Sequence, residues 1–135
     1  MNKSILWGLA SLTAVFTSCQ KENTVNSPVT NIAVVANTQN AFSFTLPASS
    51  YSATLDYSLS FTTDTLACSL TVTGQTTGSG SLRIADSNYS TVYADSMLTN
   101  QVVAFTQTGK GVPKRINMVF AGYTGTVTLA LSRSH

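Results

Sequence analysis

Residues 51–61 carry the pattern that most constrains the fold, a strict alternation of apolar and polar side chains. The apolar positions are Tyr51, Ala53, Leu55, Tyr57, Leu59 and Phe61, with Ser, Thr or Asp at every position between them. Side chains of a β-strand point alternately to opposite faces, so this segment predicts a strand with one buried and one exposed face. At ~3.3 Å per residue it would span ~36 Å, so we expect a bend or bulge within it.

Similar short apolar runs, separated by turn residues, fill the rest of the chain from residue 32. Residues 66–72 repeat the alternation after a turn at 62–64, so the two segments form a hairpin or a crossing between sheets. The other predicted strands are residues 32–35, 42–46, 82–85, 91–94, 102–107, 115–121 and 126–132. Pro47 is expected to end the second of these, and residues 75–80 and 122–125 to form Gly-containing loops.

These segments predict a single all-β domain over residues 32–135. We expect an antiparallel β-sandwich of about nine strands, with a jelly-roll or Ig-like topology. The predicted core consists of the residues that alternate with polar neighbours within their strands. They are Leu55, Leu59, Phe61, Leu66, Cys68, Leu70, Ile84, Met118, Phe120, Val127 and Leu129.

Charge is sparse and balanced along the chain. Lys and Arg number 7 and Asp and Glu number 5, among 135 residues that include 39 Ser and Thr. Nucleic-acid binding requires a basic surface that neutralises phosphates, and no such excess is present. We therefore expect no nucleic-acid partner.

The first eighteen residues read as a removable leader. Lys3 supplies a positive start, residues 5–16 are apolar, and small residues lead to Cys19. The apolar run is too short to span ~30 Å of hydrocarbon comfortably. Residues 21–31 are polar and contain Pro28, which predicts a flexible tether before the domain.

The junction Phe16-Thr17-Ser18-Cys19 resembles the lipobox of bacterial lipoproteins, in the looser form found in Bacteroidota. Gln20-Lys21-Glu22 partly resembles the surface-export signal that follows the cysteine in those proteins. The resemblance implies a signal peptide over residues 1–18, a lipidated Cys19 that begins a tether over residues 19–31, and anchoring to a membrane by acyl chains. It implies location in the cell envelope as an outer-membrane lipoprotein, on the periplasmic side or the cell surface.

Parts of the domain are similar to small extracellular β-sandwich modules, such as the pre-peptidase C-terminal type or CUB-like bacterial domains. The segments concerned are residues 78–86, 91–93, 109–113, 116–120 and 125–129. Those modules usually place Gly in the turn after the Asp, where this chain has Asn88-Tyr89. The resemblance implies a sandwich with an accessory role and transfers no binding residue.

Catalytic and metal-binding groups are few, and we expect neither enzyme activity nor a cofactor. The one His is the terminal His135, and Cys68 alternates with Leu66 and Leu70, as a buried hydrophobic residue would. Asp86 and Asp95 could approach across a hairpin as a pair of catalytic carboxylates, or bind Ca²⁺ with Asn88, but Asp is also a common turn residue. We therefore predict no metal site.

Tyrosines in turns are the best candidates for a binding function, because sugar rings pack on exposed aromatic faces. Tyr89, Tyr93 and Tyr123 are the predicted ligand-binding residues, whereas Tyr51 and Tyr57 fall in the apolar alternation and are expected in the core. The segment that contains Lys110, Lys114 and Arg115 is expected to be a solvated basic loop. These features predict a binding or accessory module with a glycan or protein partner.

Two further possibilities follow from short segments. Asp64-Thr65-Leu66 and Asp95-Ser96-Met97 resemble the O-glycosylation triplet of exported Bacteroidota proteins, which would modify Thr65 and Ser96. As an alternative function, the domain could be a structural or assembly subunit that pairs with another protein through an edge strand. An exposed edge strand of six or more residues without Lys, Pro or a bulge would favour that alternative.

Overall fold

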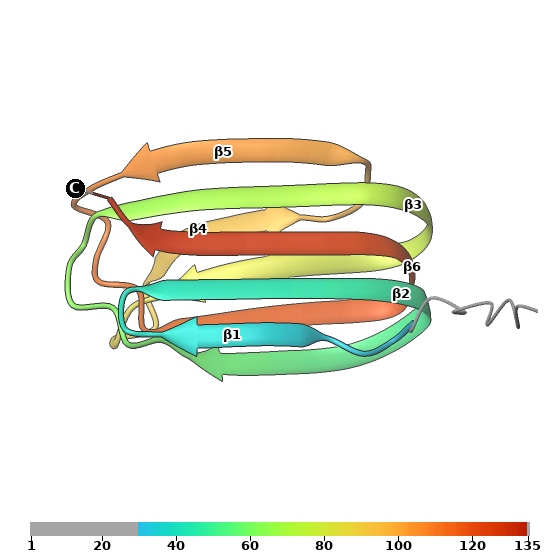
Figure 1. Cartoon of the computed structure of the whole chain (residues 1–135), viewed down its shortest axis with the longest axis horizontal. Coiled ribbons are helices and arrows are strands. Elements are labelled where there is room, and N and C mark those ends of the chain that lie inside the picture. Colours follow the sequence, from blue (N-terminus) through green and yellow to red (C-terminus); the bar gives the residue numbers. More distant parts are fainter. Residues whose placement is uncertain (1–29, 135) are drawn as a thin grey trace, which may run out of the picture.

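A computed structural model describes residues 30–134, and every regular element in this part of the chain is a β-strand (Figure 1). The strands are β1 (Val34–Thr38), β2 (Ala41–Ser58), β3 (Leu66–Ala85), β4 (Thr91–Ser96), β5 (Gln101–Gln107) and β6 (Arg115–Arg133). They form one antiparallel sheet in the order β1-β2-β6-β3-β4, with β5 also paired to β3. The predicted all-β class is confirmed, but residues 30–134 form six strands rather than about nine.

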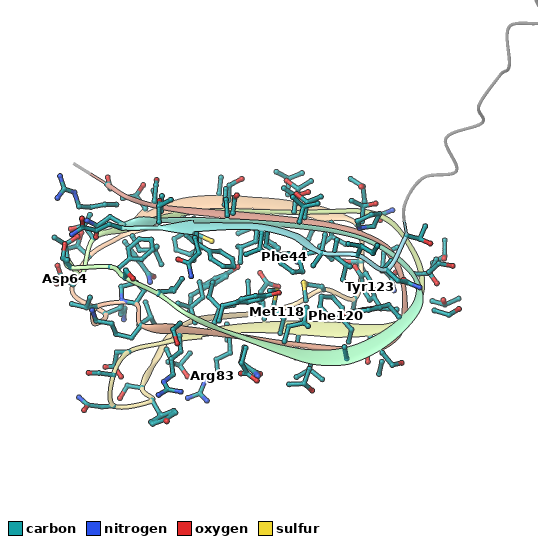
Figure 2. The ribbon with its side chains drawn as sticks, turned by 60° about the horizontal axis from the view of Figure 1, so that its bottom comes forward. Phe44, Asp64, Arg83, Met118, Phe120 and Tyr123 are labelled. Carbon is teal, nitrogen blue, oxygen red and sulfur yellow. The ribbon has the colours of Figure 1, made fainter. Side chains whose placement is uncertain are left out.

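The sheet folds over so that its two halves face each other as layers (Figure 2). The pairing of β6 with β2 and with β3 shifts register midway, around residues 48–53, 73–79 and 121–125. In the first layer, residues 41–48 of β2, 126–133 of β6 and 66–73 of β3 lie between β1 and β5. In the second layer, residues 51–58, 115–121 and 79–85 of the same strands lie beside β4.

Six of the nine predicted strands are therefore halves of three long ones. The predicted breaks at Pro47, at residues 75–80 and at residues 122–125 are wrong, because the strands continue through them while bending from one layer to the other. Residues 51–58 and 66–72 do not pair, so the chain crosses between the layers at residues 59–65. The bulge expected in the long alternating segment is present between Tyr51 and Ala53.

The core lies between the layers, where Phe44, Met118, Phe120 and Tyr123 meet (Figure 2). Ten of the eleven predicted core residues are buried, and the exception is Leu55, which is half-buried and packs against the cluster. Leu55 lies in the bent half of β2 at a free edge of the sheet, where no further strand covers its flank among the described residues. Tyr51 and Tyr57 are likewise half-buried against the core.

The outer face of the first layer has no charged side chain. Cross-strand partners place small and β-branched residues in rows that cross all five strands. The rows are Val34, Thr45, Thr128, Thr71 and Val102; Ala36, Ser43, Ala130, Ser69 and Ala104; and Thr38, Ala41, Ser132, Ala67 and Thr106. The charged groups of the described chain therefore lie on the second layer, at the ends of the strands and in the loops.

Close approach of two backbones occurs where β3 and β6 bend together. A Cβ added to Gly78 would lie 2.3 Å from the carbonyl oxygen of Gly122, and Gly78 has a φ of +76°. Gly74 has a similar φ of +62°, but nothing lies within 4 Å of an added Cβ. The two glycines therefore separate the cost of a left-handed backbone from the cost of a steric clash.

We predict that Gly78→Ala destabilises the domain substantially more than Gly74→Ala. A left-handed conformation costs a non-glycine residue roughly 1–2 kcal/mol, and both variants incur that cost. Only Gly78→Ala must also push the two strands apart at the bend. Urea unfolding of both variants measures the difference, and equal losses in the free energy of unfolding would contradict the close approach of β3 and β6.

Candidate functional site

A pocket of about 340 Å³ opens on the outer face of the second layer. Its lining residues are Asp56, Arg83, Ala85, Tyr89, Arg115 and Asn117. The register of the sheet brings them together, because Asn117 of β6 lies between Asp56 of β2 and Arg83 of β3 in one row of cross-strand partners. Asn117 donates from its side-chain nitrogen to Asp56 Oδ1 at 2.7 Å.

Arg83 fixes the turn that carries Tyr89. It points away from the layers (Figure 2). Its Nε donates to Thr91 Oγ1 at 2.9 Å, and its Nη2 donates to the backbone carbonyl of Tyr89. A planar guanidinium presents several donors in a fixed arrangement, so Arg83 ties together the two ends of this short segment. The turn is therefore held against the pocket from the side of β3.

Asp86 holds the same turn from within. Its Oδ1 accepts from the backbone nitrogens of Asn88 at 2.8 Å and Ser90 at 2.9 Å, and its carbonyl accepts from Tyr89 N at 3.2 Å. The bonds leave Tyr89 with a φ of 61°, in the region that glycine adopts readily and other residues rarely do. Tyr89 thus occupies a left-handed position in this turn at a conformational cost.

The Tyr89 ring is exposed but already has one cationic neighbour. Tyr89 is 58% exposed, and the guanidinium carbon of Arg115 lies 4.6 Å from its ring centroid. This distance is within the range of a cation–π interaction. The charged side chains that line the pocket are Arg83, Arg115 and Asp56, so their charges sum to one positive charge.

The pocket lies at the end of the domain opposite to the point where the described chain begins. Asn31 N donates to the carbonyl of Pro47 at 2.6 Å, and Asn31 Oδ1 accepts from Ser49 N at 2.8 Å. These contacts hold residues 30–31 at the end where the strands bend (Figure 1). Asp56 lies seven residues beyond Ser49 along β2, so roughly 20 Å of strand separates the pocket from the end that holds residues 30–31.

Tyr93 does not lie beside Tyr89, although both were predicted as ligand-binding residues. It is half-buried under β5, with its ring centroid 4.6 Å from that of Phe105. Its hydroxyl donates to Asp95 Oδ2, and burial together with this bond and the carboxylate's charge raises the pKa of the phenol. Tyr93 therefore closes the gap between the layers at the β4–β5 side.

Tyr123 is fully buried, so the prediction that it stands in an exposed loop is wrong. Residues 122–125 belong to the bend of β6, and the register shift there turns Tyr123 inward, where it packs edge-on against Phe120 with centroids 5.3 Å apart. A buried ring cannot stack on a ligand at the surface. Burial raises the pKa of the phenol, and its oxygen has no hydrogen-bond partner within the described part of the chain.

We predict that Tyr123→Phe raises the free energy of unfolding by about 1 kcal/mol, because it removes an unpaired buried hydroxyl and keeps the ring. Thermal or urea unfolding measures the change. Tyr51→Phe is the matched control, since Tyr51 packs against the same Phe120 ring at 5.7 Å but is only half-buried. A loss of stability in Tyr123→Phe would mean that its hydroxyl is paired.

Carboxylates do not gather into a catalytic or metal-binding cluster among residues 30–134. Asp95 pairs with Leu82 of β3, and Asp86 follows four residues later, just after β3 ends, so the backbone positions of the two Asp residues are about 13 Å apart along the strand direction. That exceeds the separation of a glycosidase pair. Asp95 is bonded by Tyr93 and by Gln101 Nε2 at 3.1 Å, and no described group of three His, Cys, Asp or Glu could hold a metal.

Cys68 is buried in the core, and its thiol is free. Burial, with a smaller contribution from the charge of Asp95, raises the pKa of the thiol to about 12. A thiol that stays protonated at neutral pH is a poor nucleophile. The prediction of a buried, hydrophobic role for Cys68 is confirmed.

The three residues of the predicted basic loop do not form one solvated cluster. Lys114 Nζ donates to the carbonyl of Phe61 at 2.6 Å, Lys110 is exposed, and Arg115 lies on β6 in the pocket. Sequence reasoning missed Arg83, Arg115 and Asn117 as site residues. Their alternation with Ile84, Ile116 and Met118 indicates an outward face, but their proximity depends on the pairing of β3 with β6.

The remaining predicted sites are exposed, half-buried or outside the described residues. Ser96 is exposed at the end of β4, and Thr65 is half-buried in the segment before β3. Their modification stays a prediction. Cys19 and His135 lie outside residues 30–134.

Comparisons with known proteins assign no family. No protein-family model matches the chain, and no curated protein matches its sequence. Residues 30–134 contain no helix long and apolar enough to span a membrane.

Proposed function

We propose that this chain is a lipid-anchored module of the cell envelope that binds glycans without catalysis, through the pocket around Tyr89. The observation that carries the proposal is the combination in one pocket of an exposed aromatic ring, two arginines and the Asp56–Asn117 pair. The ring offers a face for a sugar, and the amide and carboxylate offer partners for hydroxyl groups. A binding module needs such contact groups and does not need a pair of catalytic acid and base residues.

The charge of the pocket favours an acidic sugar. A uronic-acid carboxylate can accept two parallel hydrogen bonds from a guanidinium, which a neutral hexose cannot reproduce. Arg83 is already bonded within the turn, so Arg115 is the arginine better able to reach a ligand. The proposed ligand is therefore a polysaccharide with uronic-acid residues.

The position of the pocket agrees with a tethered module. If Cys19 is acylated, the anchor joins the domain at the end that holds Asn31, and the pocket lies at the other end. Strain at Tyr89 agrees with a binding role as well. Residues in unfavourable backbone conformations are often found at functional sites, where the surrounding contacts hold them in place.

The anchor is tested by mass spectrometry of the mature N-terminus from a bacterium that processes lipoproteins. We expect cleavage before Cys19 and a mass increase that corresponds to two or three acyl chains. The protein should then partition into detergent, because acyl chains transfer favourably from water. Cleavage elsewhere or an unmodified Cys19 would contradict the anchor and leave the pocket to be judged separately.

The pocket is tested with Tyr89→Gly on an array of neutral and uronic-acid glycans. Glycine adopts the backbone conformation of residue 89 without strain, so stability should stay within about 1 kcal/mol of the parent. Binding to acidic glycans should be lost, because the ring and its contact with Arg115 are gone. A variant that binds as the parent does would contradict the role of Tyr89.

Arg115→Ala should weaken acidic-glycan binding at least tenfold, or about 1.4 kcal/mol, since a charge-assisted pair is lost. Arg133→Ala is the matched control, because Arg133 is also exposed on β6 but lies in the first layer. It should bind as the parent does. Equal binding of neutral and acidic glycans by the parent would contradict the proposed ligand class.

A further inference from the structure

β5 forms a regular, open edge of the first layer. It pairs with residues 66–72 of β3, from Leu66↔Gln107 to Val72↔Gln101, without a register shift. No other described strand pairs with it, and it is the outermost strand of its layer (Figure 1). Alternate backbone N–H and C=O groups along its seven residues therefore point away from the sheet without a strand partner.

This edge lacks the features by which proteins block further pairing. Edge strands are commonly protected by Lys, Pro, a bulge or an inward charge. Residues 101–107 read QVVAFTQ and contain none of these, and Val102 is 74% exposed. The other described edges are less suitable, because β1 has five residues, β4 contains Asp95, and the free part of β2 contains Asp56 and, between Tyr51 and Ala53, a bulge.

The residues of β5 are also complementary to themselves in the antiparallel direction. If Ala104 lies opposite Ala104 of a second strand, then Val103 faces Phe105, Val102 faces Thr106, and Gln101 faces Gln107. Aromatic and β-branched residues are favourable cross-strand partners, and no like charges oppose each other. Val102 and Thr106 would meet on the outer face, and Val103 and Phe105 on the inner one.

We propose that two copies of this chain associate through β5, paired antiparallel about a two-fold axis that passes beside Ala104. The first layers of the two copies then form one continuous sheet. A two-fold axis closes the assembly at two copies, because each β5 edge is used once. This goes beyond the proposed glycan binding, and the pocket on the second layer does not take part in it.

The strength of the pairing follows from its size. Seven residues from each copy bury less surface than the roughly 1,600 Å² of a standard interface, so the dimer is weak in dilute solution. It forms where copies are concentrated, which anchoring to a membrane would achieve. The two-fold axis places the chain starts of the two copies at opposite ends of the pair, so an anchored dimer would lie with its strands along the membrane surface. A covalent trap on the full chain in its membrane therefore tests the proposal better than a dilution experiment.

Ala104→Cys provides the trap. Opposed residues in an antiparallel pair have Cα atoms about 4.5–5.5 Å apart, within the range that a disulfide bridges. Mild oxidation of membranes that hold the full chain should give several times more disulfide-linked dimer than the parent. The parent reports any contribution from Cys19, and the buried Cys68 does not react in the folded domain.

The register is tested by Val102→Cys and Thr106→Cys. The two copies of residue 102 lie about 13 Å apart along the strand, so Val102→Cys alone should not form a dimer. Co-expressed with Thr106→Cys under a different tag, it should form the mixed dimer.

Three results would overturn the proposal. The first is no more dimer from Ala104→Cys than from the parent. The second is equal crosslinking of Thr128→Cys, which is exposed on the same face but lies in the central strand β6. The third is a mixed dimer between Ala104→Cys and Ala36→Cys that exceeds the Ala104→Cys dimer, because it would indicate head-to-tail pairing of β5 with β1.

Discussion

One antiparallel sheet buries its own apolar face, and every other feature of the domain depends on this. β2, β3 and β6 each supply a strand to both layers, so the layers are joined through continuous backbone rather than only through side-chain packing. The bends must occur at the same level in all three strands. The contact of Gly78 with the backbone of Gly122 marks where two of them bend together.

Alternation along the chain was sufficient to predict the class of fold and nearly the whole core, because the period of two determines which side chains point inward. It did not distinguish a bend from a turn. A bend and a turn interrupt the alternation in the same way. The interruptions occur at Pro47, at the glycines of residues 74–80 and at those of residues 122–125. Only the partner strand decides between them, since β6 runs alongside β2 and β3 through each interruption.

The candidate site shows the same limit. Tyr89 could be identified from its turn because the local hydrogen bonds of Asp86 determine that turn. Tyr123 has similar neighbours in the sequence, yet a register shift in β6 turns it into the core. Arg83, Asn117 and Asp56 become neighbours only through the pairing of three strands that are distant in sequence. No local pattern records that pairing.

The central position of β6 has a consequence for how the chain folds. This last strand links β2 to β3 in both layers, and Ala41 near the start of the domain pairs with Ser132 near its end. Contacts between residues so distant in sequence make folding slow, in the millisecond-to-second range typical of all-β domains. Until β6 has been synthesised, β2 and β3 have no strand to join them. The domain is therefore expected to complete its folding only after β6 has been synthesised.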